Sequence, residues 1–403
     1  MSRIAILSDI HFGKFCRASS FHVPGEENQD RCKGVYPLEQ GLIELCNKME
    51  PQYFFVAGDL TSLGNPQEFF YCEQKILEIA KRTGVNINNV FCVLGNHDID
   101  WNISKIGTNT QSTNKEIDNL VKGKYQMMAA NCAKISMEYL WKNYRDYGPA
   151  PFSGTVEKDD FVLTVLNTGQ FCTHDQKFSH GKLEQKQMQW FEKASEKYKN
   201  DVRTKILLMH HHPFNYSYPI PGIDISTIEE GAELMDLAAQ NGIDIIIHGH
   251  RHHPYIKTLQ IGSGKKPLTM ICAGSLSVNA EHRNNGEIPN TVHFLDIDKE
   301  KDYYIVYNYK FTDAEGWEKI DRNCKETPID TVMKVGKIFS KNEIRGAIEK
   351  YRSFENAPLS WENLEECLQF MSYEQLNKLF DEILRPTHNI VGKFPEQVVL
   401  LKK

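Results

Sequence analysis

The chain has 403 residues, of which 40% are hydrophobic and 25% are charged, and its formal net charge is −6 at pH 7. These proportions are ordinary for a globular protein and leave room for two domains. The acidic balance argues against a chain that is attracted as a whole to nucleic acid or to an anionic membrane. No apolar run reaches the roughly 18 residues that a membrane helix needs, and no signal-peptide pattern opens the chain. We therefore expect a cytoplasmic protein without a membrane partner.

Short apolar runs alternate with helical patterns through the first three hundred residues. Strands are predicted at 3–8, 53–57, 90–94, 161–167, 205–210, 243–248, 268–273, 290–297 and 302–309. Helices are predicted at 38–49, 66–83, 183–199 and 228–241. The second helix begins with Asn65 and Pro66, a cap followed by a first-turn proline. Strands that alternate with helices indicate an α/β fold with buried sheets.

Two long stretches interrupt this alternation. Residues 12–36 follow the first strand, and residues 99–150, with a predicted helix at 120–143, follow the third. Loops of such length are usually functional or carry their own structure. Both stretches leave strand ends that carry acidic and histidine residues, so we expect them to shape a substrate pocket.

The pattern changes near residue 311. Strand alternation disappears there, and residues 311–403 are predicted to be mostly helical. Ser340 with Glu343, and Ser372 with Gln375, have the spacing of capping boxes. We therefore divide the chain into a domain at 1–310 and a small helical C-terminal domain at 311–403. The C-terminal helices could bind a partner protein or form a homo-oligomer.

Side chains of the types that bind metals directly follow five predicted strands. They are Asp9 and His11, then Asp59, then Asn96, His97 and Asp98, then His211, and finally His250 and His252. Each motif alone is a weak signal, but open α/β sheets bind their ligands at the carboxyl ends of the strands. Five such groups at one edge predict a site for two metal ions. Two metal ions are typical of enzymes that hydrolyse phosphate esters.

Residues 1–300 resemble the calcineurin-like metallophosphoesterase superfamily. The resemblance is carried by Asp9-x-His11, Gly58-Asp59, Gly95-Asn96-His97-Asp98, His211-x-Pro213 and Gly249-His250-x-His252. It implies a four-layer α/β/β/α sandwich and two metal ions. The implied ligands of one ion are Asp9, His11, Asp59 and His252, and those of the other are Asp59, Asn96, His211 and His250. Asp59 would bridge the two ions. Such ligands suit Mn, Fe, Zn, Co or Ni, and we expect Mn²⁺.

Three consecutive histidines follow one of these strands, and alternation lets only some of them face the ions. The family's His-x-Pro pattern selects His211, two residues before Pro213. His210 is then expected in the core or behind the ligands, although a ligand role for it stays open. His212 is expected to form a hydrogen bond behind the ligands.

Two bridged cations would lower the pKa of a water between them, and the resulting hydroxide would attack phosphorus. His97 stands outside the implied ligand set and is similar to the family's catalytic histidine, which contacts the phosphate and can act as a general acid. Asp98 could orient His97, or it could serve in a turn. Arg251 lies between two implied ligands and could face the substrate or solvent.

The resemblance implies a wide range of substrates. The stretch from Gly58 to Gly64 lacks the arginine of the protein-phosphatase pattern, and the short Gly-Asn-His-Asp motif is more similar to the phosphodiesterase and nuclease branches. We therefore expect a phosphodiesterase with a nucleotide-like substrate. A phosphomonoesterase and a non-catalytic scaffold of the same fold are alternatives.

A DNA nuclease of the repair type is a further alternative. Lys334, Lys337, Lys341 and Arg345 recur at helical spacing and could follow the phosphates of nucleic acid. The helix start expected at Ser340 would interrupt this stripe, and a solvated helix face is the competing interpretation.

Overall fold

The structure is a computed structural model. It describes residues 1–26, 37–99, 146–147, 153–172, 180–214, 226–262, 266–283, 286–320, 329–356 and 358–403. The helix predicted at 120–143 lies outside the described residues, as do large parts of the two long stretches at 12–36 and 99–150.

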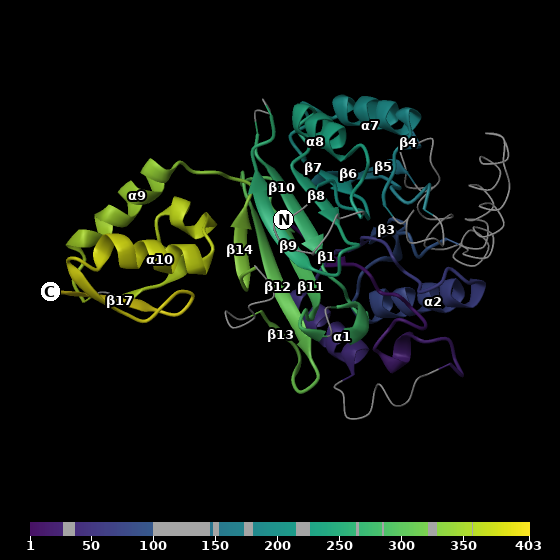
Figure 1. The fold of residues 1–403 in the computed structure, drawn as a ribbon, viewed down its shortest axis with the longest axis horizontal. Helices are drawn as coiled ribbons and strands as arrows, with labels where there is room; N and C mark the ends of the chain where they lie inside the picture. The colour runs from purple at the N-terminus through teal and green to yellow at the C-terminus, as the bar shows by residue number, and fades with distance from the viewer. Residues whose placement is uncertain are drawn as a thin grey trace.

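Two seven-stranded sheets form the centre of the molecule (Figure 1). The first sheet has the strand order β13-β12-β11-β1-β2-β3, with β14 beside β12. Its strands are β1 (Ser2–Leu7), β2 (Tyr53–Val56), β3 (Val90–Cys92), β11 (Asn290–Ile297), β12 (Tyr304–Thr312), β13 (Gly316–Lys319) and β14 (Val332–Val335). The second sheet has the order β4-β5-β6-β7-β8-β10-β9. Its strands are β4 (Asp146–Tyr147), β5 (Gly154–Glu157), β6 (Phe161–Val165), β7 (Thr204–Leu208), β8 (Ile245–His248), β9 (Pro254–Leu259) and β10 (Leu268–Ala273).

Helices cover the outer face of each sheet. The helices α1 (Leu38–Met49) and α2 (Pro66–Arg82) pack on the first sheet, and α7 (Gln185–Lys197) and α8 (Gly231–Gln240) pack on the second (Figure 1). The resulting four layers confirm the predicted α/β/β/α sandwich. No helix within the described ranges is both long and apolar enough to span a bilayer.

The period of two along each strand explains the layers. In β1, Ala5 and Leu7 join the core beneath α1 and α2, whereas Ile4 and Ile6 join the core between the two sheets. Successive side chains of a strand point to opposite faces, so a strand that is apolar throughout fills both cores. The continuous apolar runs of the sequence therefore mark strands that are buried on both sides.

Parallel pairing brings the strand ends together. The strand β2 pairs in parallel with both β1 and β3, and β7 pairs in parallel with β6 and β8. The carboxyl ends of these strands therefore lie at one edge of each sheet. The acidic and histidine motifs that predicted the metal site begin at these strand ends.

The first sheet continues to Val335, beyond the domain boundary predicted at residue 310. That boundary cuts through β12, and the short edge strands β13 and β14 pair with that strand. Four-residue edge strands that include Glu318, Lys319 and Lys334 lack the continuous apolar run by which the central strands were predicted.

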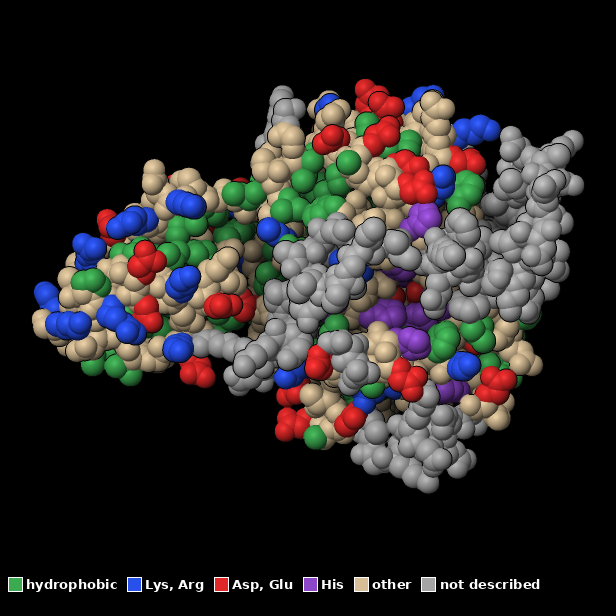
Figure 2. Space-filling model, in the orientation of Figure 1, with side chains coloured by type: hydrophobic (Ala, Val, Ile, Leu, Met, Phe, Trp, Pro, Cys, Tyr) green, Lys and Arg blue, Asp and Glu red, His purple; other side chains and the backbone are tan. Residues whose placement is uncertain are grey.

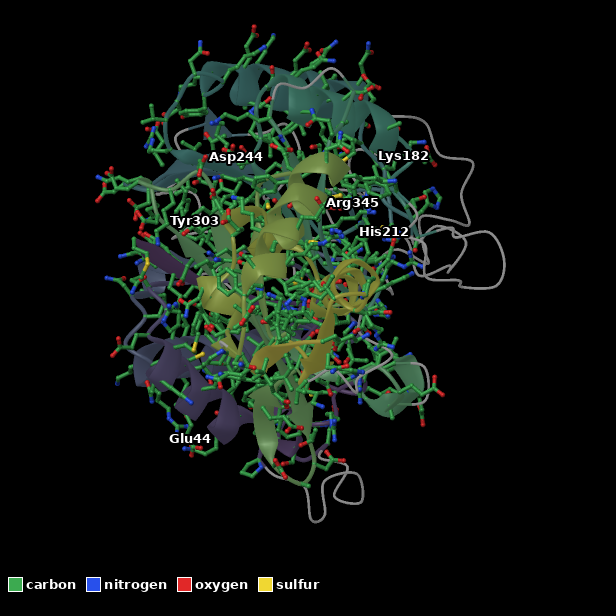
Figure 3. All side chains as sticks on the ribbon, turned by 90° about the vertical axis from the view of Figure 1, so that its left-hand side faces the viewer. Glu44, Lys182, His212, Asp244, Tyr303 and Arg345 are labelled. Atoms are coloured by element: carbon green, nitrogen blue, oxygen red, sulfur yellow. The ribbon has the colours of Figure 1, made fainter. Side chains whose placement is uncertain are left out.

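Residues 341–403 form a C-terminal unit with its own apolar core. This unit lies beside the sandwich (Figures 1 and 3). It contains α9 (Lys341–Glu349) and α10 (Tyr373–Leu384), but also a sheet of β15 (Pro358–Leu359), β17 (Val398–Lys402) and β16 (His388–Val391) that was not predicted. The side chains of Ser340 and Ser372 both accept a hydrogen bond from the third residue of their helices, but only Ser340 and Glu343 form the complete capping box.

The predicted helical stripe of basic residues does not form. Lys334 lies on β14, and the helix α9 begins only after the cap at Ser340. Lys337 Nζ lies 2.6 Å from a carboxylate oxygen of Glu366 and 2.8 Å from one of Asp302. These pairs partly neutralise the basic charge that a DNA backbone would need.

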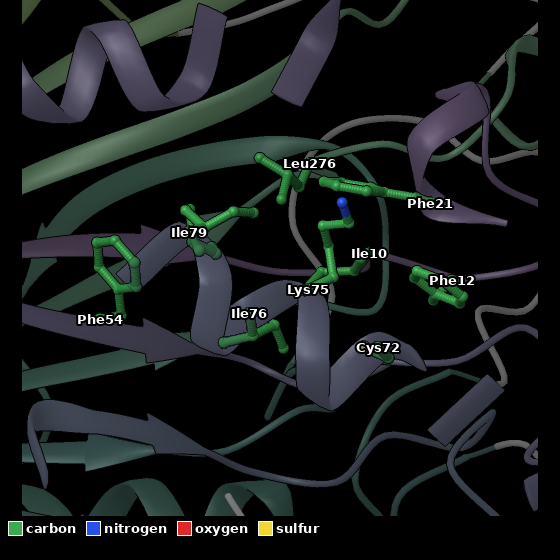
Figure 4. A pocket seen from close by; sticks show the side chains of 10 residues that line it. Ile10, Phe12, Phe21, Phe54, Cys72, Lys75, Ile76, Ile79 and Leu276 are labelled. Atoms are coloured by element: carbon green, nitrogen blue, oxygen red, sulfur yellow. The ribbon is translucent and has the colours of Figure 1, made fainter. Parts of the chain in front are cut away.

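Short 3₁₀ helices complete the described structure. They are η1 (Ser19–Phe21), η3 (Ile87–Asn89), η6 (Ala280–His282), η8 (Lys350–Ser353), η9 (Trp361–Asn363) and η10 (Glu366–Phe370). A cavity of about 10 Å³ lies between α2 and the first sheet, and Figure 4 shows the side chains around it. Its lining is apolar apart from the Lys75 side chain, so it offers a bound ligand neither space nor polar partners.

Candidate metal centre

The predicted ligands converge at the edge formed by the strand ends. Histidine side chains gather in one area of the sandwich surface (Figure 2). Two groups with the geometry of metal ligands form there, one of Asp9, His11, Asp59 and His252 and the other of His210, His211 and His250. Within each group, one ligand atom from every residue lies within 4.8 Å of those of the others.

Asp59 connects the two groups. Its Oδ2 atom lies 3.4 Å from Nε2 of His11 in the first group and 3.2 Å from Nε2 of His210 in the second. Its Oδ1 atom accepts a hydrogen bond of 2.9 Å from the backbone N–H of His97. One oxygen therefore holds the carboxylate in place, and the other faces both groups.

The side chains of the first group lie close together, and a backbone carbonyl orients the ring of His252. The Nε2 atom of His252 lies 3.1 Å from Oδ1 of Asp9 and 3.3 Å from Nε2 of His11. The Nδ1–H of His252 donates to the backbone carbonyl of His282 over 2.9 Å. Such a bond fixes the ring so that the other nitrogen faces the site, as is usual for metal-binding histidines.

In the second group, the ring of His210 faces Asp59 and Asn96. Nε2 of His210 lies 3.2 Å from Oδ2 of Asp59, 3.2 Å from Oδ1 of Asn96 and 3.2 Å from Nδ1 of His250. Its Nδ1–H donates to the carbonyl of Ala57 over 2.7 Å. The ring is therefore oriented in the same way as that of His252.

His211 also lies in this group, but both of its ring nitrogens contact other side chains. Nδ1 lies 2.8 Å from Oγ1 of Thr168, and Nε2 lies 3.6 Å from Sγ of Cys172. His211 was selected by the family's His-x-Pro pattern, and the strand alternation that allowed this choice does not extend to these histidines, because β7 ends at Leu208. His212 is buried and lies 3.3 Å from Ser226, behind the site as predicted.

These distances fit metal ions. Ligand atoms that share one ion at bond lengths of about 2.1 Å are separated by roughly 3.0 to 3.4 Å. The contacts around Asp59 Oδ2 and around His210 Nε2 fall in this range. Carboxylate, amide and imidazole donors together form the borderline-hard set that suits divalent transition metals.

Several of these ligands have a strained backbone. The φ angle is positive at Asp9 (50°), His11 (49°), Asp59 (50°), His250 (73°) and His252 (53°). Only two other non-glycine residues in the described ranges have positive φ, Glu50 and Asn356. Each left-handed residue costs on the order of 1 kcal/mol or more, and such strain concentrates at functional sites. The concentration of strain here indicates that the positions are set by function.

The buried charges compensate one another. Burial lowers the pKa of His11 to about 4, and burial with the neighbouring imidazoles holds the pKa of His250 well below its ordinary value. Burial opposes protonation of His210 as well, but the carboxylates of Asp59 and Asp9 raise its pKa to about 9. Although burial disfavours its charge, Asp59 stays ionised because His210, His97 and His11 hold its pKa well below the usual range. A bound cation would take the place of the proton on His210.

His97 lies beside the first group rather than within it. The centroid of its ring lies 4.6 Å from that of His11. Nδ1–H donates to the backbone carbonyl of Ser62 over 2.8 Å, which fixes the orientation of the ring. The structure therefore places the predicted catalytic histidine next to the candidate ligands.

Asp98 is buried and connects two of the motif loops. Its Oδ2 accepts hydrogen bonds from the backbone N–H groups of Leu60 and Gly95, and its Oδ1 accepts from the N–H and the hydroxyl of Thr61. Burial and the charge of Asp59 raise the pKa of Asp98 to about 7. This geometry matches the turn role that the sequence left open. Arg251 is half-buried, so its exposure does not favour either of its two predicted partners, the substrate or solvent.

Gly95 allows Asp59 to lie close to the neighbouring loop, which leads to a prediction. A Cβ atom at residue 95 would lie 2.1 Å from Oδ1 of Asp59 and 2.5 Å from its backbone nitrogen. We expect Gly95→Ala to displace the carboxylate, to lower the amount of bound metal and to lower the free energy of unfolding by about 1–3 kcal/mol. Metal analysis after dialysis measures the metal content, and urea unfolding measures the stability.

Gly346→Ala in α9 is the matched control, because a Cβ there meets no heavy atom within 4 Å. It should leave the metal content unchanged and stabilise the helix by about 0.5–1 kcal/mol. A Gly95→Ala protein with full metal content would contradict the proposed close approach.

Comparison with known proteins places this geometry in a family. The family model of calcineurin-like phosphoesterases matches residues 2–254, more than half of the chain. Among solved structures, a dimetal phosphatase from Danio rerio is 10% identical, with a TM-score of 0.44 and coverage of 83% of this chain and 98% of that one. A purple acid phosphatase from yellow lupin (Lupinus luteus) seeds is 14% identical, with a TM-score of 0.46 and coverage of 84% and 54%. A search of curated proteins found no match. The chain belongs to the calcineurin-like phosphoesterase family.

Proposed function

We propose that this protein is a phosphodiesterase that uses two divalent ions, with Mn²⁺ as the natural metal. Membership of the family indicates the hydrolysis of a phosphate ester. The position of Asp59 carries the proposal of two ions, because its Oδ2 lies 3.4 Å and 3.2 Å from imidazole nitrogens of two separate groups. One carboxylate oxygen in that position suits a bridge between two cations.

The proposed ligand sets follow from the contacts. Asp9, His11, Asp59 and His252 would hold one ion, and Asp59, Asn96, His210 and His250 would hold the other. His210 is preferred to His211 because its Nε2 faces Asp59 and Asn96, while the nitrogens of His211 contact Thr168 and Cys172. When bound, two such ions supply an activated water and neutralise charge on the phosphate.

The roles of the remaining residues follow from their positions. His97, with Nδ1–H bound to the Ser62 carbonyl, donates a proton from Nε2 to the leaving alkoxide. Asp98 acts through the loops that it joins and is a positioning residue for Asp59 and Asn96. Arg251 follows His250 directly and serves as a contact for the substrate phosphate.

The alternatives have different support. The DNA nuclease was supported by a stripe of basic residues, and that support is lost. Lys334 contacts Gln369, and Lys337 contacts Glu366 and Asp302. A non-catalytic scaffold is disfavoured by the intact ligand groups. The short Gly95-Asn96-His97-Asp98 motif supports a diester over a monoester. A cytoplasmic location and an oligomer formed through the C-terminal unit remain predictions.

The separation of ligands from the catalytic histidine predicts different results for three variants. His210→Ala should lose about one ion per chain and nearly all hydrolysis. His211→Ala should keep both ions, and His97→Ala should keep both ions while kcat falls by about 10²- to 10⁴-fold. Metal analysis and assays with excess Mn²⁺ distinguish these results. Loss of an ion in His211→Ala, with both retained in His210→Ala, would reverse the ligand assignment.

The diester preference predicts the result of a substrate comparison. The Mn²⁺-loaded protein should hydrolyse bis(p-nitrophenyl) phosphate and a cyclic nucleotide with a higher kcat/KM than p-nitrophenyl phosphate. Single- and double-stranded DNA test the nuclease alternative, and Asp59→Asn is the inactive control. Hydrolysis of monoesters alone would reject the diesterase, and no hydrolysis of any ester would favour the scaffold.

A further inference from the structure

We propose, resting on the function proposed above, that Phe15 and His282 form an aromatic wall that stacks a nucleobase of the substrate. The substrate class is then a nucleotide ester rather than an ester of two small alcohols. Neither residue belongs to the ligand groups, and sequence motifs did not select them.

The wall stands directly beside the reaction site. The ring centroid of Phe15 lies 5.8 Å from that of His97, at an interplanar angle of 89°, and 6.1 Å from that of His11. Because His97 is the proposed proton donor to the leaving group, a group that leaves toward His97 also approaches Phe15. The ring is therefore within reach of the nucleoside attached to the reacting phosphate.

His282 extends the wall from a different part of the chain. Its ring centroid lies 4.7 Å from that of Phe15, at an angle of 69°. Its backbone carbonyl accepts the hydrogen bond from Nδ1 of His252, so η6 is tied to a proposed metal ligand. The two rings thus come from two loops that both contact the metal centre.

The backbone of Phe15 is held firmly, although its ring is half-exposed. The N–H of Phe15 donates to Oγ of Ser62 over 2.9 Å, and its carbonyl accepts from the N–H of Asn279 over 2.8 Å. Ser62 in turn donates to the carbonyl of His11 over 2.7 Å. A half-exposed aromatic ring on a fixed backbone loses little conformational entropy when a ligand stacks on it.

The chemistry of the wall favours a base over an alkyl chain. A nucleobase offers a π face to the Phe15 ring and a polar edge to the exposed imidazole of His282, whereas an alkyl chain offers only apolar contact. The exposed Lys14, whose Nζ lies 6.0 Å from the Phe15 centroid, adds positive charge that suits an anionic ligand. Aromatic stacking of one base typically contributes roughly tenfold or more to affinity.

Two ligands that differ only in the base measure the contribution of the wall. Calorimetry of the Mn²⁺-loaded protein with AMP and with ribose 5-phosphate gives a ratio of the two dissociation constants. We expect AMP to bind about tenfold more tightly to the wild-type protein. Phe15→Leu should reduce this ratio to within about twofold, His282→Ala should reduce it partly, and Phe15→Trp should preserve it.

Phe70→Leu is the matched control, because Phe70 is also partly exposed but lies on α2. It should leave the ratio at the wild-type value, and metal analysis with thermal unfolding shows that each variant is folded and loaded. Equal binding of AMP and ribose 5-phosphate by the wild type, or an unchanged ratio in folded Phe15→Leu, would overturn the proposal. The proposed function fails separately if no phosphate ester is hydrolysed, since the ratio is measured by binding alone.

Discussion

The buried carboxylate of Asp59 is the interaction on which the rest of the site depends. Its Oδ1 is held by the backbone of His97, and its Oδ2 faces imidazoles of two groups that come from both sheets. The strand β2 makes this possible, because it is paired on both sides and ends between the loops that follow β1 and β3. The second sheet supplies His210 and His250 from the ends of β7 and β8.

The sandwich fixes these side chains at an energetic cost. Five candidate ligands have left-handed backbones, and two carboxylates are buried among imidazoles. Groups of this kind persist only where the surrounding structure determines their positions. Three apolar cores, one between the sheets and one on each outer face, provide that rigidity. A bound cation would offset part of the cost by compensating the charges of Asp9 and Asp59.

The sequence predicted the α/β sandwich, and it named side chains that the structure brings together at one edge of the sheets, for physical reasons. Central strands are buried on both faces and therefore appear as continuous apolar runs, so β1, β2 and β8 were found close to their observed bounds. The ligands follow these strands directly. The predictions failed where that signal is missing, at the edge strands β13 and β14 and in the sheet of the C-terminal unit.

The choice among the histidines and the aromatic wall needed the structure. His210 and His211 both follow the end of β7, where the chain no longer alternates, and the contacts of His210 with Asp59 and Ala57 show that its ring is turned toward Asp59. Phe15 and His282 are far apart in the sequence, one in a turn and the other at the end of the three-residue helix η6, and neither segment has a periodic pattern. Only the packing of the two loops reveals that their rings lie 4.7 Å apart.

Electron paramagnetic resonance of the Mn²⁺-loaded protein tests the Asp59 bridge most directly. Two ions joined by one carboxylate should give the multiline spectrum of an exchange-coupled pair. In Asp59→Asn, whose side chain tolerates the same left-handed backbone, that spectrum should be replaced by the signal of isolated Mn²⁺. A wild-type protein that shows only isolated Mn²⁺ at full loading would contradict the dinuclear centre.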